Sequence, residues 1–166
     1  MDILSAIENS GVGIWVRESG SLWAYPTIIF FHSLGLSFLV GMSVALDLRL
    51  LGVASGLPLA PLERLYPIMW FGFWINAISG VALSIADAAT MLVSGVFWVK
   101  MTCIVAAVVA MIVIRRQLFS PSRAPVLSVP LKTKILAGSS LALWAGAITA
   151  GRLTAYLGPV AGLLGR

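Results

Sequence analysis

Three ionisable side chains lie inside otherwise apolar segments of this chain: His32, Lys100 and Arg152. An ionisable group at the centre of a membrane-spanning helix costs about 2.5–3.5 kcal/mol, so such residues indicate function unless another role explains them. At ~1.5 Å per residue, His32 lies ~13 Å below one end of its segment. By the same measure, Lys100 and Arg152 lie ~8 Å below that end in two other segments. Because three segments place cations at similar depth, we expect them to share one pocket.

The imidazole has the most specific chemistry of the three. His32 lies too deep for its ring to reach the membrane surface, and a buried histidine there can serve as a metal ligand, above all as an axial ligand to haem iron. The alternative is a neutral histidine bonded to a backbone carbonyl or a serine. Lys100 and Arg152 have an alternative too, since long cationic side chains can extend to the membrane surface.

Other residue patterns in the chain are less specific for a chemical function. Asn76 lies near the middle of its apolar segment, and Gly35 follows His32 by one helical turn, where a missing side chain would admit a flat ring. Asp47 and Arg49 look like a structural motif at a helix end, pairing with each other or with nearby arginines. The sequence has no phosphate-binding loop, no Ser/His/Asp set and no paired catalytic carboxylates, which disfavours a hydrolase.

The elements that position these residues are membrane helices. Of 166 residues, 60% are hydrophobic and 10% charged, and the mean hydropathy is +1.02, which excludes a soluble enzyme. Each apolar segment can cross a hydrocarbon core of ~30 Å. We therefore predict an all-α integral membrane bundle of four transmembrane helices, forming a single domain over residues 1–166. The predicted spans cover residues 23–46, 65–86, 96–114 and 135–157, after a short interfacial helical lead-in over residues 1–22, broken at Gly11 and Gly13.

Basic residues predict the orientation. Seven lie in the two loops on one side, which marks that side as cytoplasmic, and these are Arg49, Arg64, Arg115, Arg116, Arg123, Lys132 and Lys134. Both termini then face outward, into the periplasm if the source is a Gram-negative bacterium, and we expect a multi-pass protein of the bacterial inner membrane. The expected partners are the lipid bilayer and either further copies of the chain or a larger membrane complex, with no nucleic acid. Cys103 is the only cysteine, so no intrachain disulfide can form.

Several short sequence motifs in the chain resemble those of known protein families. The pattern His32-Ser-Leu-Gly35, followed by Asp47-Leu-Arg49-Leu-Leu-Gly52, resembles a family of small bacterial inner-membrane proteins of unknown function. More distantly, the layout is similar to that of the copper-resistance D proteins and of the haem-containing bacterial protoporphyrinogen IX oxidases. The matching positions to those oxidases are His32, Pro67, Gly80 and Lys100.

The resemblance to the oxidases implies that His32 and Lys100 take part in haem b binding. We therefore expect a haem b-binding membrane protein that works in electron transfer or a related oxidation. His32 would be the axial ligand, Lys100 a second ligand or a proton or propionate partner, and Arg152 a propionate partner. Whether the chain is an enzyme stays open. The alternatives are a copper or small-solute handling protein and a non-catalytic structural subunit of a membrane complex.

Overall fold

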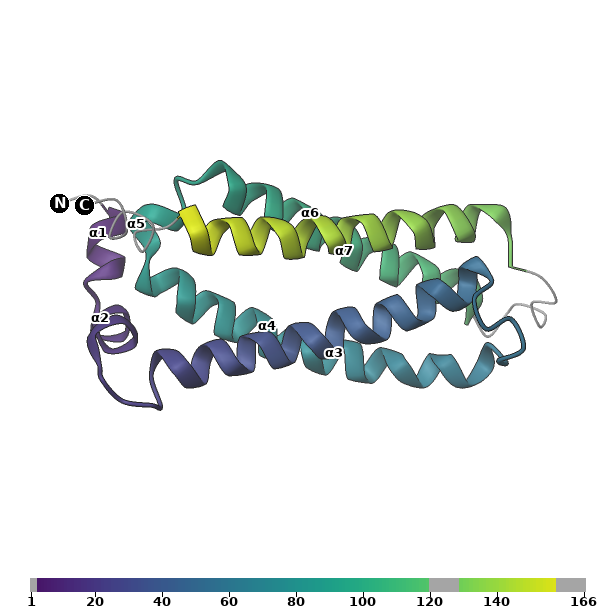
Figure 1. The fold of residues 1–166 in the computed structure, drawn as a ribbon, viewed down its shortest axis with the longest axis horizontal. Coiled ribbons are helices and arrows are strands. Elements are labelled where there is room, and N and C mark those ends of the chain that lie inside the picture. Colours follow the sequence, from purple (N-terminus) through teal and green to yellow (C-terminus); the bar gives the residue numbers. More distant parts are fainter. Residues whose placement is uncertain (1–2, 120–128, 158–166) are drawn as a thin grey trace.

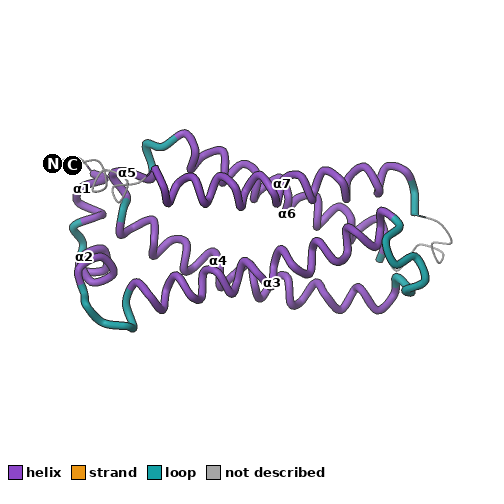
Figure 2. Tube along the Cα trace, in the orientation of Figure 1, coloured by secondary structure: helices purple, strands orange, loops and turns teal. Residues whose placement is uncertain are grey.

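The computed structural model describes residues 3–119 and 129–157, and within them the chain forms helices and turns without a strand. Four long helices of the described chain run alternately up and down in an elongated bundle (Figure 1). Short connections lie at its two ends (Figure 2). The long helices are α3 (Tyr25–Leu51), α4 (Leu65–Ala86), α6 (Gly95–Leu118) and α7 (Leu131–Leu157), and the short ones are α1 (Ile3–Glu8), α2 (Gly11–Glu18), the 3₁₀ helix η1 (Ala60–Arg64) and α5 (Ala88–Met91).

Three of the helical segments are long and apolar enough to cross a membrane: Tyr25–Leu51, Ala60–Ala86 and Gly95–Leu118. Helix α7 is just as long as α3, with 27 residues. Its apolar run is diluted by glycines, serines and threonines and by charged residues at both ends. Composition alone therefore supports three of the four predicted spans.

The first long helix extends beyond its predicted end at residue 46. It continues to Leu51 and ends at Gly52, whose φ of 107° is in the left-handed region that favours glycine. The Gly52 amide donates to the Arg49 carbonyl, and the Val53 amide donates to the Leu48 carbonyl. Asp47 and Arg49 therefore belong to the helix and do not follow it.

The lead-in was predicted to form one or two short helical pieces and forms two, but the predicted break at Gly11 and Gly13 is wrong. The chain turns at Asn9 and Ser10, and the Ser10 hydroxyl accepts a hydrogen bond from the Gly13 amide at 3.3 Å. Gly13 lies within α2, where a Cβ atom would collide with the Glu8 carbonyl. The glycine thus permits α1 and α2 to pack closely.

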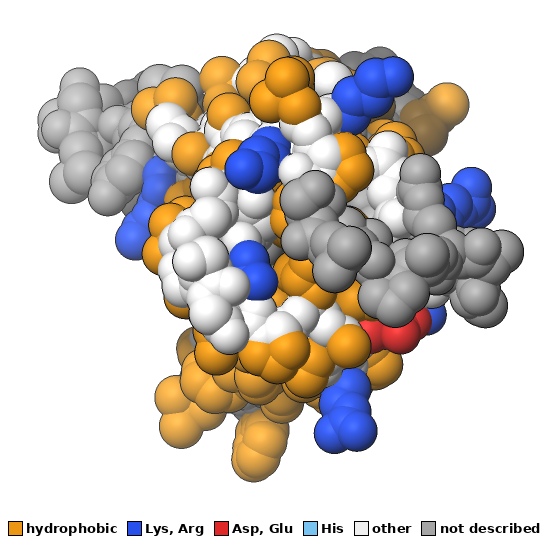
Figure 3. Space-filling model, turned by 90° about the vertical axis from the view of Figure 1, so that its right-hand side faces the viewer, with side chains coloured by type: hydrophobic (Ala, Val, Ile, Leu, Met, Phe, Trp, Pro, Cys, Tyr) orange, Lys and Arg blue, Asp and Glu red, His pale blue; other side chains and the backbone are white. Residues whose placement is uncertain are grey.

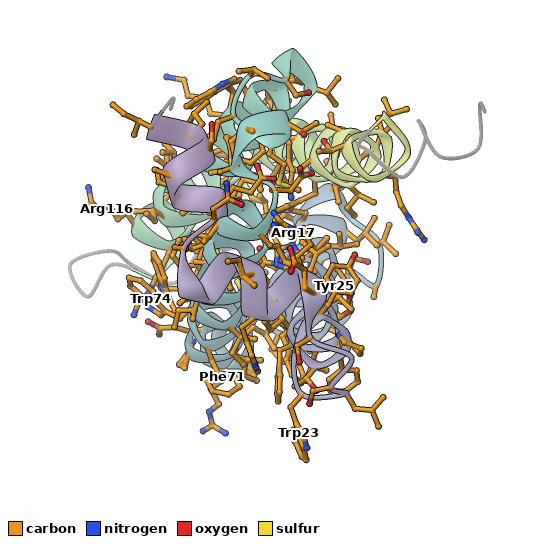
Figure 4. The ribbon with its side chains drawn as sticks, turned by 90° about the vertical axis from the view of Figure 1, so that its left-hand side faces the viewer. Arg17, Trp23, Tyr25, Phe71, Trp74 and Arg116 are labelled. Carbon is orange, nitrogen blue, oxygen red and sulfur yellow. The ribbon has the colours of Figure 1, made fainter. Side chains whose placement is uncertain are left out.

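We name the two ends of the bundle after arginines that lie there. At the Arg17 end, α1 and α2 lie across the ends of the long helices (Figure 4). The Arg17 guanidinium bonds to Glu8 at 2.9 Å and to the Ala86 carbonyl at 3.4 Å. The Arg115 end holds the loop after α3 and the end of α6, and Lys and Arg side chains are spread over it (Figure 3).

The long helices pack as two pairs. Helix α3 packs along α4 and α6 along α7, and the pairs are joined mainly between α3 and α7. Helices α3 and α4 touch at Gly35 and Gly72, where a Cβ on either glycine would lie 2.7 Å from the other's carbonyl oxygen. Most of the fully buried apolar side chains gather towards the Arg115 end, among them Leu46, Leu50 and Ile114.

Candidate functional site

The candidate site is built on the crossing of α3 and α4. These helices are antiparallel, so His32, one turn before Gly35, lies opposite Asn76, one turn after Gly72. The His32 Nδ1 atom lies 3.1 Å from the Asn76 carbonyl oxygen, and the Asn76 side-chain amide donates to the His32 carbonyl at 2.8 Å. Each residue thus binds the backbone of the other helix with its side chain.

Two further residues of α4 complete the surroundings of the imidazole. The Ser79 hydroxyl oxygen lies 3.1 Å from His32 Nδ1, and the same hydroxyl donates to the Ile75 carbonyl at 2.6 Å. At Gly80, a Cβ atom would lie 3.1 Å from His32 Cε1, so the glycine leaves space for the ring. The Asn76 side-chain nitrogen also lies 3.4 Å from Nδ1 and 3.5 Å from Nε2. The ring is therefore held mainly through Nδ1, has the Asn76 amide beside it, and packs against a glycine.

Lys100 lies in the same part of the bundle as His32. Its side chain runs over Gly151 of α7, where a Cβ atom would lie 3.6 Å from Lys100 Cε. The ammonium is close enough to His32 for the two groups to interact electrostatically. Within the described residues, Lys100 makes no hydrogen bond that would fix it in a structural role. Two of the three predicted site residues thus come together.

Arg152 is not buried with them. It follows Gly151 on α7, and its side chain is exposed. Successive helical residues point about 100° apart, so when Gly151 faces Lys100, Arg152 points to the side. The depth estimate placed Arg152 at the right level of the bundle but gave no information on its direction.

Gly35 does not have the role that the sequence suggested. Its Cβ position lies 2.7 Å from both the Asn76 amide nitrogen and the Gly72 carbonyl oxygen. That space is filled by the backbone of α4 and is closed to a flat ring. Instead, the glycine allows α4 to approach α3 closely enough for Asn76 to reach His32.

A second polar cluster lies in the other half of the bundle, where sequence analysis expected none. We call Asp47, Ser43, Tyr66, Ser140 and Trp144 the Asp47 cluster; all five are buried. The Trp144 indole donates to the Ser43 hydroxyl at 3.0 Å. Arg49, the expected partner of Asp47, donates to the Leu57 and Ser55 carbonyls instead. The four-residue spacing of Ser43 and Asp47 is the sequence signal that could have indicated a shared polar face.

The Arg17 end carries the acidic residues Glu8 and Asp87, which lie close to Arg17. Asp87 follows α4, and burial raises the pKa of its carboxyl group. A hydrogen bond from Thr90 lowers this pKa, the neighbouring Glu8 raises it, and Arg17 lowers it. A carboxylate oxygen of Glu8 also accepts a hydrogen bond from the Ala89 amide at 3.0 Å. Charged groups therefore fasten α1 and α2 to α5.

Residues that could bind a bare metal ion are dispersed. Among the described residues, no three His, Cys, Asp or Glu side chains come together. Met69 and Met111 are in the buried core, whereas Met101 is exposed on α6. Cys103 is half-buried, and a Cβ atom on Gly146 would lie 3.4 Å from its sulfur.

The chain was compared with family models, with curated proteins and with solved structures. The model of a family of unknown function, DUF6644, matches residues 5–157. No curated protein and no solved structure matches the chain.

Proposed function

This chain belongs to the DUF6644 family of unknown function, and we propose that it is a haem b-binding protein of the bacterial inner membrane, working in electron transfer or a related oxidation. The proposal starts from His32 and from how α4 holds its ring. The haem would supply one-electron redox chemistry at its iron. The chain's own residues would bind and orient it.

The observation that carries the proposal is the contact between His32 Nδ1 and the Asn76 carbonyl at 3.1 Å. A carbonyl can only accept, so Nδ1 carries the hydrogen, and the neutral ring then has its lone pair on Nε2. The Asn76 side-chain nitrogen lies 3.5 Å from Nε2, so a ligand there would replace this long contact. Metal-binding histidines in proteins are typically held in this way, through a hydrogen bond from the second ring nitrogen to a carbonyl or carboxylate. Ser79 adds a second oxygen at the same nitrogen.

A haem suits a chain with one histidine. The porphyrin brings four nitrogen ligands of its own, so the protein needs to supply only one or two. His32 would supply the first. Lys100 would be the second ligand or a proton or propionate partner, because it shares the site with His32. The other candidates for the second ligand are a methionine such as Met101 and the His32 side chain of a second copy of the chain.

Arg152 fits a more peripheral role. It follows Gly151, the residue that Lys100 contacts, and its guanidinium is exposed. An exposed guanidinium beside the site suits a propionate at the protein surface, which arginine can bind in a bidentate manner.

Copper handling is less well supported. Cu(I) prefers sulfur ligands, and the described methionines and Cys103 are spread over the buried core and the exposed helix surface. A structural subunit is the stronger competitor, because the bonds of His32 to Asn76 and Ser79 would serve a purely structural histidine equally well. The two functions differ in whether Nε2 takes a ligand.

The membrane arrangement is part of the proposal. Helix α7 packs along α6 and contacts α3, both of which can cross a membrane, so we take α7 as the fourth span. The Arg115 end, with its basic residues, would face the cytoplasm. His32 and Lys100 would then lie in the periplasmic half.

The test is His32→Ala beside Ser33→Ala. Ser33 is the next residue of α3 and is exposed, and its hydroxyl donates to the Ile29 carbonyl of its own helix. In detergent-purified protein we expect His32→Ala to lose the Soret band while its circular dichroism stays helical, and Ser33→Ala to keep both. A His32→Ala protein with undiminished Soret absorbance would overturn the ligand assignment. A colourless wild type whose stability falls on His32→Ala substitution would identify a structural histidine.

A further inference from the structure

The Asp47 cluster places a carboxyl group deep inside the apolar part of the bundle. Asp47 is 1% exposed, Tyr66 1% and Ser140 0%. The residues come from three helices, with Asp47 on α3, Tyr66 on α4 and Ser140 on α7. They are surrounded by core residues such as Leu50, Met111 and Ile114.

Several polar atoms of the cluster lack a hydrogen-bond partner among the described residues. They are Asp47 Oδ2, the Tyr66 hydroxyl and Ser140 Oγ. Buried polar atoms are almost always hydrogen-bonded, so a group of three that is not requires an explanation. These three atoms belong to neighbouring residues. The Ser140 hydroxyl lies beside the Asp47 carboxyl group, and Tyr66 is close enough to Asp47 for an electrostatic interaction.

No cation of the described chain balances an ionised Asp47. The described ion pairs are Arg17 with Glu8 and Glu18, and Arg115 with Glu63. Of the elements packed around Asp47, α4 offers Tyr66 as a titratable group, α7 offers Ser140 and Trp144, and α6 offers apolar Met111 and Ile114. An unpaired ionised carboxylate is costly in such surroundings. A proton removes that charge, and the resulting carboxyl O–H can donate to one of the unpartnered hydroxyl oxygens of the cluster.

The surroundings of Tyr66 indicate from which end a proton can arrive. Tyr66 lines a cavity of about 580 Å³ whose other walls include Glu63, Trp70 and Arg115. The Arg115 guanidinium carbon lies 5.4 Å from the centre of the Tyr66 ring. Towards His32, the bundle is filled by Leu39 and Met69, which are fully buried. Water can thus approach the cluster from the Arg115 end.

We propose that Asp47 is a proton-binding site that exchanges its proton through Tyr66 with water in the cavity at the Arg115 end. On release, the carboxyl O–H bond breaks, the carboxylate remains, and the proton passes to water; uptake is the reverse. The Tyr66 hydroxyl can relay the proton because it both accepts and donates a hydrogen bond. The site is independent of haem.

The test is infrared spectroscopy of the purified full chain. We expect the wild type to show a carboxylic-acid C=O band that shifts in D₂O and disappears as the pH is raised. Asp47→Asn should lack this band, while Glu63→Gln, at the mouth of the cavity, should keep it. Tyr66→Phe should keep the band but slow its D₂O shift several-fold.

Three results would overturn the proposal. The first is a spectrum of Asp47→Asn that matches the wild type. The second is loss of the band when NaCl is added at constant pH, because the site would then bind a metal cation. The third is a Tyr66→Phe protein that exchanges at the wild-type rate, which would remove the relay. Should Asp47→Asn fail to fold, Ser140→Ala provides the same test, because removal of a neighbouring hydroxyl should change the frequency of the Asp47 band and leave the band present.

Discussion

His32 and Asn76 bind each other's backbone: the ring nitrogen Nδ1 of His32 lies 3.1 Å from the Asn76 carbonyl oxygen, and the Asn76 amide donates to the His32 carbonyl at 2.8 Å. The first contact orients the imidazole, and the second joins α3 to α4. Because the group that orients the ring is a backbone carbonyl, substitution of the Asn76 side chain leaves it in place.

This arrangement predicts that Asn76→Ala separates stability from ligand binding. Loss of the amide bond should lower the free energy of unfolding by about 0.6 kcal/mol, the mean for hydrogen bonds between membrane helices, and by at most about 1.7 kcal/mol. Haem should be retained. Ser84→Ala is the control, because the Ser84 hydroxyl bonds to the Gly80 carbonyl of its own helix. Thermal unfolding in detergent and the Soret absorbance measure the two effects. Loss of haem as complete as in His32→Ala would show that the amide side chain positions the ring.

The glycine contact between α3 and α4 gives a second prediction. Gly72→Ala places a Cβ atom 2.7 Å from the Gly35 carbonyl and 2.8 Å from the Leu39 amide nitrogen. The helices must move apart, at a cost of about 1–3 kcal/mol for overpacking. Gly41→Ala is the matched control in α3, since its Cβ would meet nothing within 4 Å. It should be neutral or stabilise the helix by up to about 1 kcal/mol. Equal melting temperatures for the two variants would contradict the close contact.

The third prediction concerns pH and Asp87. Burial raises the pKa of this carboxyl above its usual value of 3.8, so the folded protein binds the proton more tightly than the unfolded chain does. The folded state is therefore favoured at low pH, and this contribution is lost as the pH rises through the raised pKa. Asp87→Asn should raise the melting temperature at pH 7, and the difference should vanish below pH 3.8. A lower melting temperature for Asp87→Asn at pH 7 would show that attraction to Arg17 outweighs burial.

The proposed orientation predicts which cysteines react from outside the cell. In a Cys103→Ser background, Gly20→Cys lies at the Arg17 end and Ser55→Cys at the Arg115 end, and both positions are exposed. With intact spheroplasts, a membrane-impermeant maleimide should label Gly20→Cys but label Ser55→Cys only after lysis. An epitope tag added after Arg166 should be accessible from outside if α7 crosses the membrane. The reverse labelling pattern would contradict the orientation, and a tag that is protected until lysis would contradict the fourth span.

Much of the fold could be predicted from sequence because long apolar runs leave few alternatives. Helix α6, for example, begins at Gly95, one residue before the predicted start of its span at residue 96. The site was harder, because depth along a helix can be counted but direction cannot when every face is apolar. The depth estimate therefore placed His32, Lys100 and Arg152 at similar levels, but it could not show that the Arg152 side chain is exposed. Asp47 was misinterpreted because its neighbour Arg49 suggested a helix end, but the helix runs on to Leu51 and buries the carboxyl group.

The most direct test of haem binding is the visible absorption spectrum of the detergent-purified wild type, produced with ample haem supply and recorded oxidised and then reduced with dithionite. If His32 Nε2 binds haem iron, the spectrum shows a Soret band, with α and β bands that sharpen on reduction. A colourless protein would contradict haem binding and leave His32 as a residue that holds α3 against α4.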